Sequence, residues 1–327
     1  MTHAADSLQE SIERTGSIAV VGLDPRPNLL PPAVVRAALA VHGDTAEAVG
    51  HAFLAFNHGI LSAVVGRCAA VKPQLACYEA YGLIGWSVYQ ETVAAAHRLG
   101  IPVIADGKRN DIGSTAEHYA QAFFGGTPGQ SAAPGLNGTP LDNPSPVDWA
   151  TVNGYLGSDG IAPFLGQASA GTGIFVLVKT SNASSGDLQD RELAGDAGSG
   201  HGTVAEAMAR LVALWGATRI GSSGLSDVGA VVGATYPSQA KRLRELMPQA
   251  IFLVPGYGAQ GGSAADALAG LRPDGTGVVV NNSRAILAAW QKSPALAWTD
   301  AARAALEAMN ADLAQARTAL FSGGGRA

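Results

Sequence analysis

Eight short apolar runs recur along the chain, and each is followed by a polar residue or a turn and then by a segment with helical spacing. Continuous apolar runs of this kind are typical of parallel strands that are buried on both faces. An open dinucleotide-binding sheet would carry an early glycine fingerprint, which this sequence lacks. The pattern therefore predicts a (β/α)₈ barrel. The runs lie at residues 17–24, 69–71, 101–105, 149–152, 173–179, 228–232, 251–254 and 277–280.

The chain of 327 residues is predicted to form one barrel domain over residues 1–327, with the barrel itself at about 17–290. Residues 125–148 and 184–202 are rich in Gly, Pro, Ser and Asn. We expect them to be long loop insertions, because the strand pattern continues across both. A C-terminal helix is expected at about 298–320.

The composition excludes or disfavours several classes of protein. Hydrophobic residues make up 47% of the chain and charged residues 14%, which excludes general disorder. A net charge of −5 disfavours a nucleic-acid surface, and no apolar stretch is long enough to predict a membrane span. The N-terminal segment lacks the pattern of a signal peptide, so we expect a cytoplasmic protein. Cys68 and Cys77 lack metal-ligand spacing and are expected to be reduced thiols.

In a (β/α)₈ barrel the chemistry gathers at the carboxyl ends of the strands. Polar residues end most of the predicted strands here, where a packed end would be apolar. The residues at these ends are Asp24, Lys72, Asp106, Lys108, Asn153, Ser181, Pro255 and Asn281.

The segment VIADGKRNDIGST at residues 103–115 places three charges at one strand end. Side chains at i and i+2 share a strand face, so Asp106 and Lys108 point the same way, and Asp111 follows on the next turn. An ammonium held between two carboxylates stays protonated, which suits a proton donor to carbon. The alternative is a surface salt-bridge cluster, which a preceding buried strand disfavours.

The glycine-rich segment VPGYGAQGG ends the seventh run, and the segment VVVNNSRAI ends the eighth. Loops at these positions commonly bind phosphate in this fold. The backbone around the glycines can approach an anion, Gln260 adds an amide donor, and Arg284 can donate to two phosphate oxygens. Ordinary turns are the alternative, but a lone cation in the first turn of a helix is unfavourable unless an anion is present.

Four motifs in this strand order, KPQ, DGKRND, PGYGAQGG and NNSRAI, resemble the orotidine 5′-phosphate decarboxylase family in its longer-chain bacterial branch. The resemblance covers residues 17–290. It implies a homodimeric (β/α)₈ lyase without a cofactor or metal. The implied reaction converts orotidine 5′-phosphate to uridine 5′-phosphate and carbon dioxide in pyrimidine nucleotide synthesis.

The resemblance also implies catalytic roles for particular residues. Lys108 would donate the proton to C6, and Asp106 would face the carboxylate of the substrate. Lys72 and Asp111 would complete an array of alternating charges. Three residues would reach into the site of a second subunit: Asp111, Ile112 and Thr115.

Roles in substrate binding follow in the same way. Asp24 and Lys72 would contact the ribose hydroxyls, and Gln260 and Arg284 the phosphate, beside Pro255. Ser181 matches the family's contact to the pyrimidine, although its neighbours Thr180 and Asn182 can share that contact. The two insertions depart from the shorter members of the family.

Two other functions remain open from the residues. A metal-dependent lyase acting on a sugar phosphate can keep a D-x-K-x-x-D motif, but Lys72 would disfavour a cation at the strand ends. A catalytically silent nucleotide-binding protein would bind uridine 5′-phosphate without turnover, which the intact Asp106, Lys108 and Asp111 disfavour.

Overall fold

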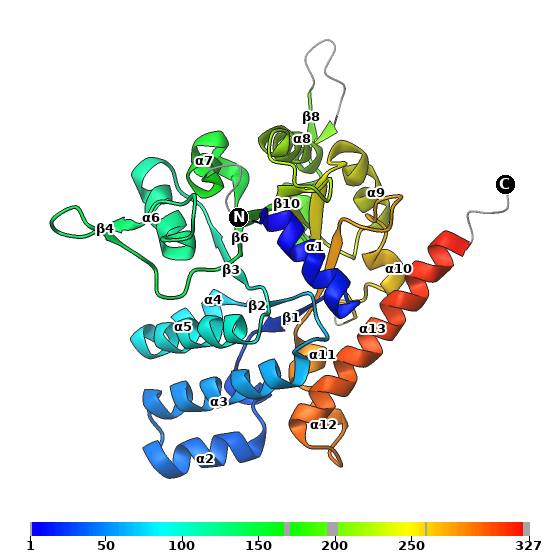
Figure 1. The fold of residues 1–327 in the computed structure, drawn as a ribbon. Helices are drawn as coiled ribbons and strands as arrows, with labels where there is room; N and C mark the ends of the chain where they lie inside the picture. The colour runs from blue at the N-terminus through cyan, green and yellow to red at the C-terminus, as the bar shows by residue number, and fades with distance from the viewer. Residues whose placement is uncertain (1, 167–170, 195–201, 259, 323–327) are drawn as a thin grey trace.

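A computed structural model describes residues 2–166, 171–194, 202–258 and 260–322. Eight parallel strands form the barrel, in the spatial order β2, β1, β12, β11, β10, β7, β6, β3 (Figure 1). Their bounds are β1 Ala19–Leu23, β2 Ala70–Pro73, β3 Ile104–Arg109, β6 Trp149–Val152, β7 Gly173–Lys179, β10 Ser226–Val232, β11 Ala250–Val254 and β12 Val278–Asn282. The fold predicted from the sequence is confirmed.

The ring closes between β2 and β3 through isolated bridges rather than a continuous ladder. Val71 pairs with Val103, and Gln74 pairs with Asp106. Between the other neighbouring barrel strands, the ladders pair three to five residues. The β2–β3 seam is therefore the part of the ring with the sparsest backbone pairing.

Helices surround the barrel and follow the strands in alternation (Figure 1). Their bounds are α1 Ala4–Thr15, α2 Pro32–His42, α3 Ala46–Val64, α4 Leu75–Glu79, α5 Gly82–Arg98, α6 Gly113–Phe124, α7 Ser158–Leu165, α8 Val204–Gly216, α9 Pro237–Leu246, α10 Ala264–Ala267, α11 Arg284–Leu287, α12 Ala289–Lys292 and α13 Trp298–Ser322. None of these helices is both long and apolar enough to span a bilayer.

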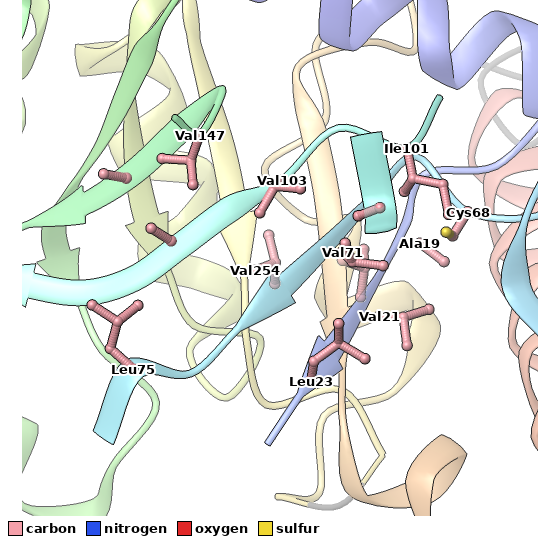
Figure 2. Packing of buried hydrophobic residues seen from close by; sticks show 14 of the residues in the cluster. Ala19, Val21, Leu23, Cys68, Val71, Leu75, Ile101, Val103, Val147 and Val254 are labelled. Carbon is pink, nitrogen blue, oxygen red and sulfur yellow. The ribbon is translucent and has the colours of Figure 1, made fainter. Parts of the chain in front are cut away.

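Alternation along each strand divides the core in two. In β7, Ile174 and Val176 belong to the cluster between the sheet and the outer helices, whereas Phe175 lies in the cluster inside the ring. Figure 2 shows part of the outer cluster, where Val21 of β1 and Val71 of β2 pack together. Burial on both faces explains why the strands read as continuous apolar runs.

Helix α1 closes the amino-terminal end of the barrel. Its Leu8 joins the cluster inside the ring, and the hydroxyl of Ser11 donates to the carbonyl of Ala69. The carboxylate of Asp6 accepts hydrogen bonds from the backbone N–H groups of Ser222 and Ser223, which precede β10. A ligand therefore has to enter from the opposite end, where the strands finish.

The region after the first strand differs from the sequence prediction. The prolines at positions 25, 27, 31 and 32 predict a loop there, with the next helix beginning near Thr45, but α2 begins at Pro32. Proline at a first helical position starts a helix because the N–H that it lacks would be unpaired there. Helix α7 was also not predicted, because its eight residues follow a glycine-rich turn and include Pro163.

The two insertions contain local structure. Residues 125–148 contain a short hairpin whose strands have two residues each, β4 Ala133–Pro134 and β5 Pro140–Leu141. The hairpin projects beside α6 (Figure 1). In the second insertion, the 3₁₀ helix η3 spans Ala183–Asp187, and β8 Glu192–Leu193 pairs with β9 Gly202–Thr203. Residues 195–201 lie outside the described residues.

The predicted C-terminal helix is confirmed as α13, which lies along the outside of the molecule (Figure 1). Its Leu306 is fully buried in the outer cluster. Trp298 stacks on Phe56 of α3, with ring centroids 5.3 Å apart. The helix therefore covers apolar surface that α3 and β1 would otherwise expose.

Candidate active site

A cavity of about 680 Å³ lies at the carboxyl end of the barrel. This volume suits a small-molecule ligand, and all eight barrel strands, or the residues directly after them, contribute to its wall. The lining residues that lie on the strands are Lys72, Asp106, Lys108, Thr151, Leu177, Val231, Leu253, Asn281 and Asn282, and Asp24 directly follows β1.

Asp106 lies at the centre of a network of polar side chains. Its Oδ2 accepts from Lys72 Nζ at 2.5 Å and from Gln74 Nε2 at 2.9 Å. Its Oδ1 accepts from Lys108 Nζ at 2.6 Å and from Thr151 Oγ1 at 2.9 Å. The structure thus places a carboxylate between two ammonium groups, whereas the sequence pattern predicts Lys108 between Asp106 and Asp111.

Asp106 and Lys72 keep each other ionised. Burial by itself would raise the pKa of Asp106, but the nearby Lys72 and Lys108 outweigh it and hold that pKa well below its usual value. Burial would likewise lower the pKa of Lys72, but the carboxylates of Asp106 and Asp24 outweigh it and raise that pKa. A fixed carboxylate and a fixed ammonium therefore face the cavity together.

Lys108 is the most accessible member of the network. Its side chain is 44% exposed, whereas those of Lys72 and Asp106 are 6% and 8% exposed. Among the described residues other than glycine, it alone has a positive φ, at 47°. Such backbone strain collects at functional sites, because the surrounding structure has to hold it. The conformation leaves the Lys108 ammonium within reach of a bound ligand.

Polar oxygen atoms beside this network lack partners. Oδ1 of Asp24 and Oδ1 of Asn281 are buried and accept no hydrogen bond within the described residues. A buried polar atom of this kind costs free energy unless a ligand or water satisfies it. Both residues line the cavity, and hydroxyl groups of a ligand would satisfy them.

The residues predicted to bind phosphate line the same cavity as the Asp106 network. Pro255, Gly256, Gln260 and Arg284 all line it. Gly256 has a φ of 97°, which turns the backbone directly after β11. Arg284 is exposed at the start of α11, and its guanidinium makes no ion pair within the described part of the chain. These groups can meet a dianion at the cavity rim.

Of the three candidates for a pyrimidine contact, two are already engaged. Thr180 donates to Asn182 Oδ1 at 2.7 Å and accepts from Gln189 Nε2 at 2.8 Å. Within the described residues the hydroxyl of Ser181 makes no hydrogen bond, and Ser181 lines the cavity. Ser181 is therefore the free donor of the three.

Four predicted residues lie outside the cavity lining of this chain. Asp111, Ile112 and Thr115 are at the start of α6, and the Asp111 carboxylate accepts from the backbone N–H of Ile112. Asp111 follows the end of β3 at Arg109, so it leaves the face shared by Asp106 and Lys108. Asn153 turns away as well, and its side chain caps a 3₁₀ helix by accepting from Tyr155.

Sequence reasoning missed Gln74 and Thr151. Gln74 follows Lys72 by two residues, so strand alternation gave a signal for it. Thr151 is a polar residue inside the apolar run WATV, which is a weaker signal, because threonine is common in strands. Its hydroxyl becomes informative only when the neighbouring strand is known to be β3.

Comparison with known proteins identifies the family. The profile of the "Orotidine 5'-phosphate decarboxylase / HUMPS family" matches residues 59–297. An orotidine 5′-phosphate decarboxylase of Rhodopirellula baltica is 41% identical over 94% of this chain and 98% of its own length. One from Caldicellulosiruptor bescii is 36% identical over 89% of this chain and 91% of its own.

Solved structures agree with the sequences. The OMP decarboxylase of Leishmania donovani superposes with a TM-score of 0.70 at 31% identity, over 97% of this chain and 100% of that one. The chain therefore belongs to the orotidine 5′-phosphate decarboxylase family, and its enzyme class is that of the carboxy-lyases.

Proposed function

We propose that this protein decarboxylates orotidine 5′-phosphate to uridine 5′-phosphate in de novo pyrimidine synthesis, with Lys108 as the proton donor to C6 and without a cofactor. The named activity of its relatives supports the reaction. The observation that carries the proposal is the Lys72–Asp106–Lys108 network, with the Lys108 ammonium open to a nucleotide-sized cavity.

The difficult step is the loss of carbon dioxide from C6. It leaves an electron pair in an sp² orbital that the pyrimidine ring does not delocalise, so the enzyme has to stabilise charge that develops in the transition state. Two unit charges about 4 Å apart interact by about 4 kcal/mol at an effective dielectric constant of about 20. One such pair is too little, so several fixed charges and a closed site have to act together.

In this scheme the Lys108 ammonium stabilises the developing charge and then transfers its proton to C6. Asp106 orients that ammonium and faces the carboxylate that the substrate loses. Lys72 neutralises the other oxygen of Asp106, which keeps the aspartate ionised within a buried site. Proton donation by an oriented lysine therefore needs all three side chains.

The remaining contacts divide the substrate between the two sides of the cavity. Asp24, whose Oδ1 has no partner among the described residues, and Lys72 suit the ribose hydroxyls. Ser181 suits the pyrimidine, and Gln260, Arg284 and the backbone after Pro255 suit the phosphate. Phosphate binding is remote from the bond that breaks, and its free energy can close loops and exclude water around C6.

A second copy of the chain would complete the site. Asp111, Ile112 and Thr115 lie outside the cavity of their own chain, on a surface where Ile112 is 51% exposed. We propose a homodimer in which these residues reach the cavity of the neighbouring subunit. We also propose a cytoplasmic location, because the substrate and product are charged nucleotides.

The deciding experiment incubates purified, EDTA-treated protein with orotidine 5′-phosphate and follows the ultraviolet absorbance of the substrate. We expect the absorbance to fall as uridine 5′-phosphate forms, at a rate that added Mg²⁺ does not change. Activity that EDTA abolishes and Mg²⁺ restores would favour a metal-dependent lyase. Tight binding of uridine 5′-phosphate without turnover would favour a silent binding protein.

A further inference from the structure

The last residue of β7, Lys179, is a fully buried lysine that the proposed reaction does not use. It lies outside the cavity lining, although Leu177 before it and Thr180 after it both belong to that lining. A buried ammonium is costly unless it is paired and hydrogen-bonded. Its partners therefore indicate what it is there to hold.

Those partners come from two segments. Lys179 Nζ lies 2.8 Å from both carboxylate oxygens of Asp190 and 3.2 Å from Ser185 Oγ, all within the β7–α8 segment. It also lies 4.1 Å from the ring centroid of Tyr236, at the start of α9. Gln239 of α9 donates to Asp190 at 3.0 Å. The ammonium thus joins the segment to the strand before it and to the helix beside it.

A second connection runs parallel to this one. The side chain of Gln189 accepts from the backbone N–H of Thr180 at 2.9 Å and donates to the hydroxyl of Thr180 at 2.8 Å. Gln189 is thus hydrogen-bonded to Thr180, and Asp190 is paired with Lys179. The chain between them, residues 180–190, is closed into a loop.

This loop forms one wall of the cavity. Residues 180–182, 184, 185 and 187–189 line it, and the hydroxyl of Ser181 among them makes no hydrogen bond within the described part of the chain. Gln260 and Arg284, on the phosphate side, come from the segment after β11 and from α11, and within the described residues neither pairs with Lys179. A displacement of this loop therefore acts first on the wall that carries Ser181.

We propose that Lys179 is a positioning residue, whose ion pair with Asp190 holds residues 180–190 as the wall that recognises the nucleobase. The inference rests on the proposed function, because it takes the ligand to be a nucleotide. Asp190 is 36% exposed and its pKa is lowered chiefly by its hydrogen bond from Lys179. Without Lys179 the carboxylate loses its buried partner and is better solvated outside, so the loop would move outward.

The test compares ligands with and without the base. Isothermal titration measures the affinities of wild type and Lys179→Met for uridine 5′-phosphate and for ribose 5-phosphate. We expect the variant to bind uridine 5′-phosphate about 10- to 100-fold more weakly, and ribose 5-phosphate within about 2-fold of wild type. In turnover of orotidine 5′-phosphate, KM should rise more than kcat falls.

Two further variants separate positioning from stability. Asp190→Asn removes the ion pair at a partly exposed position and should show the same selective loss, and the double variant should be no worse than Lys179→Met alone. Lys241→Met, at an exposed lysine of α9, is the matched control and should change neither affinity. If Lys179→Met does not fold, Asp190→Asn carries the comparison.

Equal weakening of both ligands, or unchanged uridine 5′-phosphate affinity in both variants, would overturn the role of Lys179. Failure of the proposed function looks different. In that case the wild-type protein itself does not turn over orotidine 5′-phosphate.

Discussion

The backbone N–H of Lys108 in β3 donates a hydrogen bond to the hydroxyl of Thr151 in β6, at 3.0 Å. The same hydroxyl donates to Asp106 at 2.9 Å. Thr151 is 1% exposed, so its side chain is fixed by packing. One threonine therefore holds both the strained backbone of Lys108, at a φ of 47°, and the carboxylate that orients the Lys108 ammonium.

Replacing Thr151 by Val keeps the shape of the side chain and removes the hydroxyl. We expect kcat to fall about 10- to 100-fold, because one buried hydrogen bond is worth about 1–3 kcal/mol when its partners stay behind. Affinity for uridine 5′-phosphate should change little. Thr151→Ser restores the hydroxyl and should recover most of kcat. A wild-type kcat in the valine variant would show that the Thr151 hydroxyl does not position Lys108 and Asp106 for catalysis.

Lys108→Ala should lower decarboxylation by at least about 10⁴-fold, since it removes both the proton donor and the fixed charge. Binding of uridine 5′-phosphate should stay measurable by titration, because the phosphate contacts remain. The exposed Lys241→Ala is the control for the loss of a lysine. Near-normal turnover in Lys108→Ala would show that another group delivers the proton.

Arg284→Ala should weaken binding of orotidine 5′-phosphate about 10- to 100-fold, the range expected for a charge-assisted hydrogen bond to phosphate. Binding of the unphosphorylated nucleoside should not change. Arg36→Ala, at an exposed arginine of α2, controls for the loss of a positive charge. Equal affinities of Arg284→Ala and wild type for the phosphorylated substrate would refute the phosphate assignment.

Mixing inactive Lys108→Ala and Asp111→Ala subunits tests whether sites are shared. If Asp111 serves the neighbouring subunit, random mixing should restore about a quarter of wild-type activity, because half of the dimers are mixed and each has one intact site. Turnover is measured on the mixture, after mass spectrometry has shown that mixed dimers form. Their complete inactivity would indicate that each chain carries a self-contained site.

Asp6 should contribute to stability in a pH-dependent way. Partial burial opposes its ionisation, but the hydrogen bonds from Ser223 and Ser222 outweigh it and lower its pKa from 3.8 to about 2. A lowered folded-state pKa adds stability that is fully present above pH 3.8 and is lost as the pH falls toward 2.

We therefore expect Asp6→Asn to be less stable than wild type at pH 7 by about 1 kcal/mol, after allowing for solvent screening. Urea unfolding at several pH values should show the difference shrinking below pH 4. Asp44→Asn, at an exposed loop position, is the control. A difference that stays constant down to pH 2 would assign the effect to packing instead of charge.

Much of the barrel was predictable because its strands are buried on both faces. The run at residues 173–179 could be read directly as β7, and residues 149–152 as β6. Asp106 and Lys108 were predicted to share a face, which their 2.6 Å contact confirms. Strand alternation is a local property of the backbone, so a single sequence reveals it.

Contacts between distant segments were not predictable in the same way. Thr151 and Gln74 meet Asp106 only because β6 and β2 flank β3 in the closed ring. Lys179 was counted as the end of a strand, and its ion pair depends on a loop that returns eleven residues later. The sequence pattern predicts Asp111 beside Lys108, but Asp111 follows the end of β3 and lies outside the cavity lining of its own chain.

The seam between β2 and β3 carries few backbone bridges, and the Lys72–Asp106 ion pair spans it. Lys72 and Asp106, which would face the substrate, therefore also hold β2 and β3 together. A protein engineer who wished to redirect this scaffold to another molecule could not simply neutralise them. Another interaction between β2 and β3 would have to replace the ion pair before the catalytic residues were changed.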